Sequence, residues 1–73
     1  MYRFDMQDDG DKTILTGKSA IKGQPIRMVV DKKAYEKYLN GAKVQDAFPD
    51  MSREEREILI SGITPQEWDE LFP

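Results

Sequence analysis

Two short fragments in the first third of the chain have residue types and spacings that occur in catalytic sites. Gly17-Lys18-Ser19 matches the end of a phosphate-binding P-loop, but that pattern requires a glycine where this chain has Lys12. Ser19 and Lys22 have the S-x-x-K spacing of penicillin-recognising enzymes. That chemistry needs a buried lysine and an oxyanion hole, which a chain of 73 residues is too small to enclose. Neither fragment predicts catalysis.

The acidic stretch around Gly10 resembles part of a calcium-binding loop that would begin at Asp5. The twelfth position of such a loop supplies a bidentate Glu, whereas this chain has Thr16 there. The chain also has no His, so acid–base chemistry would rest on carboxylates, lysines or tyrosines. The carboxylates occur at predicted helix caps and solvent-facing positions. We therefore expect no enzymatic activity, no cofactor and no metal site.

The composition is that of one small domain, residues 1–73, with 34% charged residues, a net charge of −3 and no Cys. The start of the chain lacks the basic and apolar regions of a signal peptide, and no apolar run is long enough to span a bilayer. The charge is uneven. Residues 1–42 hold eight Lys or Arg against six Asp or Glu, and residues 43–73 hold three against eight. This asymmetry indicates that the acidic half faces either a basic partner or solvent.

Three stretches predict β-strands, at about 2–7, 12–16 and 25–30. In the first stretch Tyr2, Phe4 and Met6 alternate with polar residues, which indicates a half-buried strand. Asp9-Gly10 predicts a two-residue type I′ turn, in which both central residues have positive φ. Such a turn places Leu15 opposite Phe4. We expect an antiparallel sheet of three strands.

Three further stretches predict helices, at about 32–39, 53–61 and 65–72, and helices packed on the sheet make an α+β fold. Asp31, Ser52 and Thr64 are the predicted N-caps. Glu55 and Glu67 each stand three residues after a cap, which predicts two reciprocal capping boxes.

Glycine and proline separate these helices. Gly62 lies between the last two helices and is expected to adopt the left-handed conformation that ends a helix. Residues 42–50 predict an ordered linker, because Pro49 ends any helix before the next cap.

The last helix carries the only tryptophan of the chain. Trp68, Leu71 and Phe72 are spaced at i, i+3 and i+4, and so share one face of the helix. Ile63 and Trp68 flank the Thr64 cap as a hydrophobic staple, which favours a core role for the indole over a partner-binding role. The sequence therefore predicts that the last two helices form a scaffold folded around the indole. The predicted structural anchors are Trp68, Phe48, Leu71 and Phe72.

A helix, a glycine turn and a second helix also describe a DNA-binding helix-turn-helix. Residues 66–72 hold three acidic residues and no Lys or Arg, so phosphates would repel this helix. Tyr2, Arg3 and Phe4 could instead stack on single-stranded nucleic acid, although core packing is the favoured role of the two aromatic residues. Nucleic-acid binding by the basic half stays open as an alternative.

The chain from residue 40 onward contains a set of short motifs. They are Asn40-Gly41, VQDAFP at 44–49, Ser52 with Glu55 and Arg56, SGITP at 61–65, and Trp68 with Leu71 and Phe72. This pattern resembles the C-terminal signature of a family of small bacteriophage-encoded proteins. The shared residues are caps, a turn and aromatic anchors, so the resemblance transfers no catalytic residue. It implies the cytoplasm of an infected bacterium as the compartment.

The resemblance and the absence of catalytic motifs together favour a non-enzymatic accessory protein that binds and modulates a host or phage protein. The bacterial transcription machinery, RNA polymerase, is the best single target. A nucleic-acid-binding module, an inhibitor of a defence complex and an assembly component are the alternatives. We expect a monomer that contacts no membrane. The candidate partner contacts are Arg3, Arg27, Lys32, Lys33 and Lys37, with the acidic last helix as a second surface.

Overall fold

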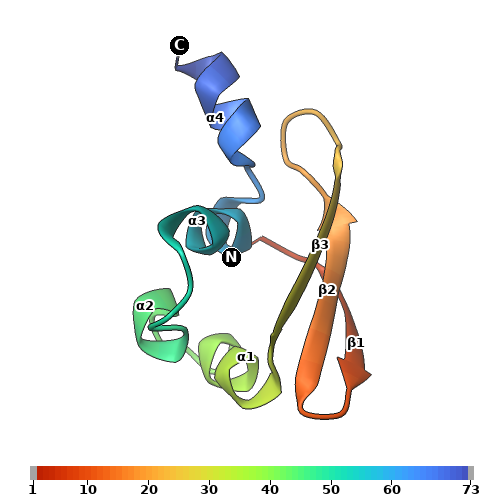
Figure 1. The fold of residues 1–73 in the computed structure, drawn as a ribbon, viewed down its shortest axis with the longest axis vertical. Helices are drawn as coiled ribbons and strands as arrows, with labels where there is room; N and C mark the ends of the chain where they lie inside the picture. Colours follow the sequence, from red (N-terminus) through yellow and green to blue (C-terminus); the bar gives the residue numbers. More distant parts are fainter. Residues whose placement is uncertain (1, 73) are drawn as a thin grey trace.

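The computed structural model describes residues 2–72 and contains a three-stranded sheet followed by helices. The strands are β1 (Asp5–Asp9), β2 (Lys12–Lys18) and β3 (Pro25–Asp31), and the helices are α1 (Lys32–Leu39), α2 (Val44–Ala47), α3 (Arg53–Ser61) and α4 (Pro65–Leu71). The sheet is antiparallel in the order β1-β2-β3, and the helices lie to one side of it (Figure 1). The predicted α+β fold is confirmed. No helix within residues 2–72 is long and apolar enough to cross a membrane.

The hairpin between β1 and β2 turns where the sequence predicts, but with a different register. Asp9 pairs with Lys12, so the two turn residues are Gly10 and Asp11, and Leu15 pairs with Met6 and not with Phe4. Gly10 has a φ of 62°, and no residue other than glycine has positive φ in the described chain. Positive φ at the first turn residue alone is the type II′ pattern, so the type I′ prediction is wrong. The physical reason is that only glycine adopts this conformation without a steric cost.

The N-terminal segment before β1 packs across the molecule, so the predicted strand at 2–7 is wrong in its bounds. The Tyr2 N–H donates to the Ile60 carbonyl at 2.9 Å, and the Tyr2 hydroxyl donates to the Lys18 carbonyl. The Tyr2 ring lies against Gly62, where a Cβ atom would approach the ring to 2.6 Å. The first residues therefore tie the end of β2 to the end of α3.

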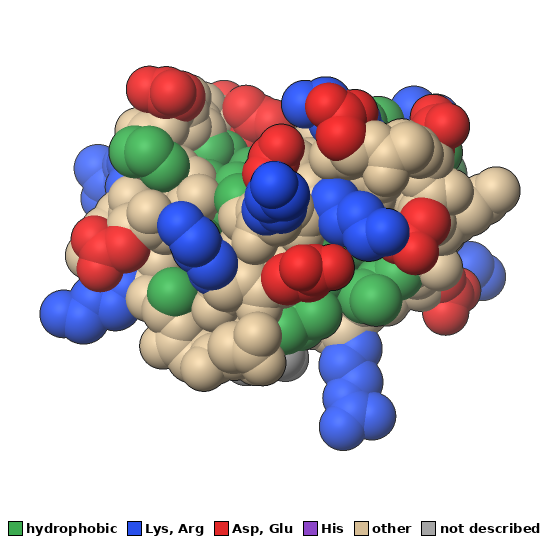
Figure 2. All heavy atoms as spheres, turned by 90° about the horizontal axis from the view of Figure 1, so that it is seen from below, with side chains coloured by type: hydrophobic (Ala, Val, Ile, Leu, Met, Phe, Trp, Pro, Cys, Tyr) green, Lys and Arg blue, Asp and Glu red, His purple; other side chains and the backbone are tan. Residues whose placement is uncertain are grey.

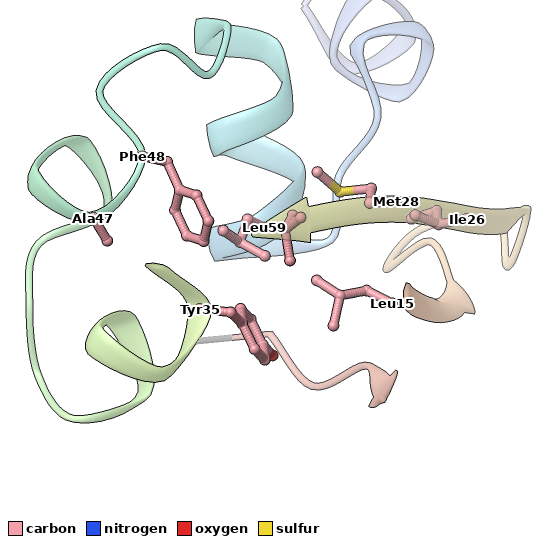
Figure 3. Close-up of a cluster of buried hydrophobic side chains, with 8 residues drawn as sticks. Leu15, Ile26, Met28, Tyr35, Ala47, Phe48 and Leu59 are labelled. Atoms are coloured by element: carbon pink, nitrogen blue, oxygen red, sulfur yellow. The ribbon is translucent and has the colours of Figure 1, made fainter. Parts of the chain in front are cut away.

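The hydrophobic core lies between the sheet and α1, α2 and α3 (Figure 3). Leu15 of β2 and Leu59 of α3 are its most completely buried apolar side chains, at 0% and 1% exposure. Because side chains alternate along a strand, β3 directs every second residue into this core and the others toward solvent. The buried apolar residues are Leu15, Ile26, Met28, Val30, Tyr35, Ala47, Phe48 and Leu59.

Most of the predicted helix ends are confirmed. The Asp31 carboxylate accepts a hydrogen bond from the Ala34 N–H at 3.0 Å, and Gly62 ends α3 with a φ of 72°. The predicted linker is ordered and contains α2, which the sequence does not predict as a helix. The capping box at Ser52 forms only in part, because the Glu55 carboxylate accepts a hydrogen bond from the Ser52 hydroxyl and not from its backbone N–H.

Candidate protein-interaction surface

The helix α4 is attached to the rest of the molecule by a buried carboxylate. It begins at Thr64, whose side chain accepts a hydrogen bond from the Glu67 N–H at 3.2 Å, while the Glu67 carboxylate accepts from the Thr64 N–H at 3.1 Å. This capping box is complete, as predicted. Its carboxylate also reaches outside the helix, because the side chain of Glu67 is fully buried against the loop between β2 and β3.

Three donors from two distant segments meet at this carboxylate. In addition to the Thr64 N–H, the Ser19 hydroxyl donates to Glu67 Oε2 at 2.7 Å and the Lys22 N–H donates to the same oxygen at 2.6 Å. The Lys22 ammonium also pairs with Glu70, one helical turn further along α4. The bonds from Ser19 and Lys22 connect α4 to residues more than 40 positions earlier in the chain. The loop between β2 and β3 and α4 therefore form one unit. We call this set, Ser19, Lys22, Thr64 and Glu67, the carboxylate anchor.

The carboxylate anchor keeps Glu67 ionised. Burial acts to raise the pKa of the Glu67 carboxyl, but the hydrogen bonds from Ser19, Thr64 and Lys22 outweigh it, and the pKa is lowered from its ordinary value of 4.5. The loop between β2 and β3 and α4 cover the Glu67 side chain completely. The hydrogen bonds of the anchor therefore favour the charged form of this carboxyl.

The Ser19 hydroxyl is buried and holds the loop between β2 and β3 together. Ser19 is 4% exposed, and its oxygen also accepts the Gln24 N–H at 2.8 Å, which closes the loop between β2 and β3. The two residues of the S-x-x-K spacing therefore have separate contacts. Ser19 lies under α4 and binds Glu67, and the Lys22 side chain pairs with Glu70 at the surface. Sequence reasoning missed this contact because it pairs residues 48 positions apart, and no local pattern carries it.

The apolar residues of α4 do not enter the core. Leu71 is 49% exposed and Phe72 is 68% exposed, while Trp68 is half-buried and stacks on Phe72 with ring centroids 5.2 Å apart. Phe48 is buried, as predicted. The prediction that Leu71 and Phe72 are buried anchors is wrong, and the domain is not folded around Trp68. We call Trp68, Leu71 and Phe72 the α4 surface.

The physical reason is the position of α4 relative to the sheet. In Figure 1 this helix extends beyond α3, beside the loop between β2 and β3, whereas α1 and α3 lie along the sheet. Leu15 and Leu59 already fill the space between the sheet and α3. The predicted helix correctly includes Trp68 and Leu71, whereas Phe72 is its C-cap and stacks on Trp68 from there. Within residues 2–72, nothing buries these three side chains completely.

A hollow of about 400 Å³ opens between α3 and α4. Ile63, Pro65 and Trp68 provide its apolar lining, and charged residues of both helices complete it. The charged lining residues are Arg53, Glu54, Glu57 and Asp69. Three carboxylates face one guanidinium, and none of the four side chains forms a salt bridge within residues 2–72. We call this feature the α3–α4 hollow.

The predicted basic contacts lie on separate parts of the molecule. Arg3 precedes β1 and Arg27 is exposed on β3, whereas Lys32, Lys33 and Lys37 belong to α1. Lys32 pairs with an acidic residue of β1 at 3.4 Å. The structure therefore brings together only the three lysines of α1, and a role for these five residues in partner binding stays a prediction.

The surroundings of the α1 lysines are not uniformly basic. Lys32 and Lys33 line a hollow together with the acidic residues Asp11, Asp31 and Glu36. Figure 2 shows acidic and basic side chains interleaved over this end of the molecule, opposite to α4. A continuous basic stripe is the usual footprint of phosphate binding, and this face does not present one.

The described chain also offers no constellation for metal binding. No group of three or more His, Cys, Asp or Glu side chains is placed to hold a metal ion within residues 2–72. The acidic residues around Gly10 therefore do not converge on a common point in this structure.

Comparisons with known proteins found no match to the chain. No protein-family model matches it, no curated protein matches it, and no solved structure matches it. The resemblance to a family of bacteriophage-encoded proteins is therefore not tested by these comparisons and stays a prediction.

Proposed function

We propose that this chain is a small non-enzymatic accessory protein that binds another protein through the α4 surface and modulates it. The observation that supports this proposal is the exposure of Leu71 and Phe72, next to the half-buried Trp68, at the end of a helix that the carboxylate anchor fixes in place. Exposed aromatic residues on a fixed element are typical of interface hot spots, where Trp is enriched. A helix held by hydrogen bonds also loses little conformational freedom on binding.

The charge of the same region argues against nucleic acid as the ligand of α4. Glu67, Asp69 and Glu70 are its only charged residues, and the hollow beside it is mainly acidic. Phosphates are attracted by Lys and Arg and repelled by carboxylates. A protein partner that offers apolar and basic groups fits this surface better. The basic residues of α1 then provide a second, electrostatic contact.

The experiment compares two lysine substitutions at apolar side chains of nearly equal exposure. Leu71 on α4 is 49% exposed, and Val29 on the open face of the sheet is 52% exposed. The wild type, Leu71→Lys and Val29→Lys, each tagged at the N-terminus, serve as bait in a bacterial lysate, with mass spectrometry as readout. Circular dichroism checks that each variant is folded.

We expect a partner that the wild type and Val29→Lys retain and that Leu71→Lys loses. Because the family resemblance implies the infected bacterial cytoplasm, purified RNA polymerase is the first partner to test directly, by biolayer interferometry with the same variants. Retention of the partner by Leu71→Lys and its loss by Val29→Lys would move the interface to the sheet. Capture of nothing above background by the wild type would contradict the proposal.

A further inference from the structure

We infer that the α3–α4 hollow binds a basic peptide segment of the partner protein, anchored by one large apolar side chain. This inference rests on the proposed function and specifies the chemistry of the partner. Three properties of the hollow carry it: its apolar lining, the charge of its rim and its fixed shape. The lining residues come from α3, from α4 and from Ile63 between the two helices.

The lining accepts an apolar side chain. Ile63, Pro65 and the Trp68 indole are all half-buried, so each presents part of its apolar surface to the hollow. The volume of about 400 Å³ lies toward the lower end of the range for ligand sites, about 300–1,000 Å³. A hollow of this size and lining suits one aromatic or large aliphatic side chain together with adjacent backbone.

The rim selects basic neighbours for that side chain. Glu54 and Glu57 of α3 face the hollow from one helix and Asp69 of α4 faces it from the other. Only Arg53 opposes them on the rim, and the salt bridges within residues 2–72 leave all four side chains available. Charge complementarity at an interface rim directs association and suppresses partners of the wrong sign. Lys or Arg residues on either side of the peptide's large apolar side chain would pair with these carboxylates.

The hollow keeps its shape without a ligand. The carboxylate anchor fixes α4 to the β2–β3 loop, and Gly62 joins α3 to that loop because its carbonyl accepts the Ala20 N–H at 2.8 Å. Both walls are therefore tied to the same loop. A preformed site avoids part of the entropy cost of ordering side chains on binding.

The single tryptophan makes binding directly observable. Trp68 is the only Trp in the chain and it lines the hollow, so a ligand that enters the hollow should change its fluorescence. The probe is a library of random twelve-residue peptides, selected on the full chain. Selected peptides are then synthesised and titrated while Trp68 emission is recorded.

Two charge reversals of the same kind distinguish an effect at the hollow from an effect of the overall charge of the protein. Glu57→Lys changes the rim of the hollow, and Glu36→Lys makes the same change in α1, at the opposite end of the molecule. We expect selected peptides to combine one large apolar residue with Lys or Arg. We also expect Glu57→Lys to weaken binding by about tenfold, and Glu36→Lys to change it by less than about twofold.

Other results overturn the inference. They are enrichment of peptides without basic residues, equal effects of the two reversals, absence of any enriched peptide, and self-association of the chain that Glu57→Lys abolishes. The last result would identify a second copy of the chain as the occupant. If Leu71→Lys abolishes partner capture while Glu57→Lys leaves it unchanged, the inference fails and the proposed function stands. If neither variant affects capture, both fail.

Discussion

The helices α3 and α4 begin with the same kind of local signal but bury different residues. Each has an N-cap hydroxyl that accepts a hydrogen bond from the backbone N–H three residues later. Yet α3 places Leu59 in the core, whereas the only fully buried residue of α4 is Glu67. The caps determine that both helices form. Their positions relative to the sheet determine which of them contributes to the core.

This difference assigns separate tasks to the two helices. The helix α3 contributes to the apolar core. The helix α4 is attached through a polar contact in which its large apolar side chains take no part. A helix held this way can expose an aromatic face without loosening from the domain.

The first prediction compares the same substitution in the two helices. Leu59→Ala removes a fully buried side chain and should lower the free energy of unfolding by about 2–5 kcal/mol. Leu71→Ala removes a half-exposed side chain and should change it by less than about 0.5 kcal/mol. Urea denaturation followed by circular dichroism measures both. Similar losses in the two variants would show that α4 packs in the core after all.

The second prediction concerns the glycine that joins the two helices. Gly62→Ala places a side chain at a φ of 72° and brings its Cβ atom to 2.6 Å from the Tyr2 ring. Gly10→Ala is the matched control, because its φ is 62° and nothing lies within 4 Å of the added atom. Positive φ costs a residue other than glycine about 1–3 kcal/mol in either variant. Thermal denaturation should show a larger loss for Gly62→Ala, and an equal loss would mean that Tyr2 moves aside freely.

The third prediction separates the attachment of α4 from the stability of the core. Glu67→Gln keeps the size of the side chain but removes the charge that accepts hydrogen bonds from Ser19, Thr64 and Lys22. Hydrogen exchange of the Lys22 and Thr64 amides should become faster in this variant. Exchange of core amides in β2 should change less. Equal acceleration throughout the chain would show that α4 and the core unfold together.

The fourth prediction concerns pH and has the smallest expected effect. Because the pKa of Glu67 is lowered in the folded state, its contribution to stability is fully present above the unfolded value, about 4.5. This contribution is lost as pH falls below 4.5 and through the folded pKa. Unfolding by urea between pH 6 and pH 3 should therefore show a smaller pH dependence for Glu67→Gln than for the wild type. Identical pH profiles would contradict this role of the carboxyl.

The candidate site was only partly predictable. The sequence correctly placed Trp68 and Leu71 on one helix, but Phe72 is the residue that follows it, and the acidic residues nearby were visible in the sequence. Their exposure was not predictable, because an amphipathic pattern describes a helix with one apolar face and does not identify what covers that face. The exposed fractions of Leu71 and Phe72 depend on the direction in which α4 leaves Gly62.

The sequence by itself determined the elements that depend on near neighbours. Asp31 and Thr64 cap helices through residues three positions away, Gly62 ends α3, and alternation along β3 sets its buried face. Only the tertiary structure decided where those elements attach. The contact between Ser19 and Glu67 spans 48 positions, and the register of the first hairpin depends on which turn residue adopts positive φ. The contact between Ser19 and Glu67 depends on the whole chain being folded, because these distant segments meet only after the core has formed.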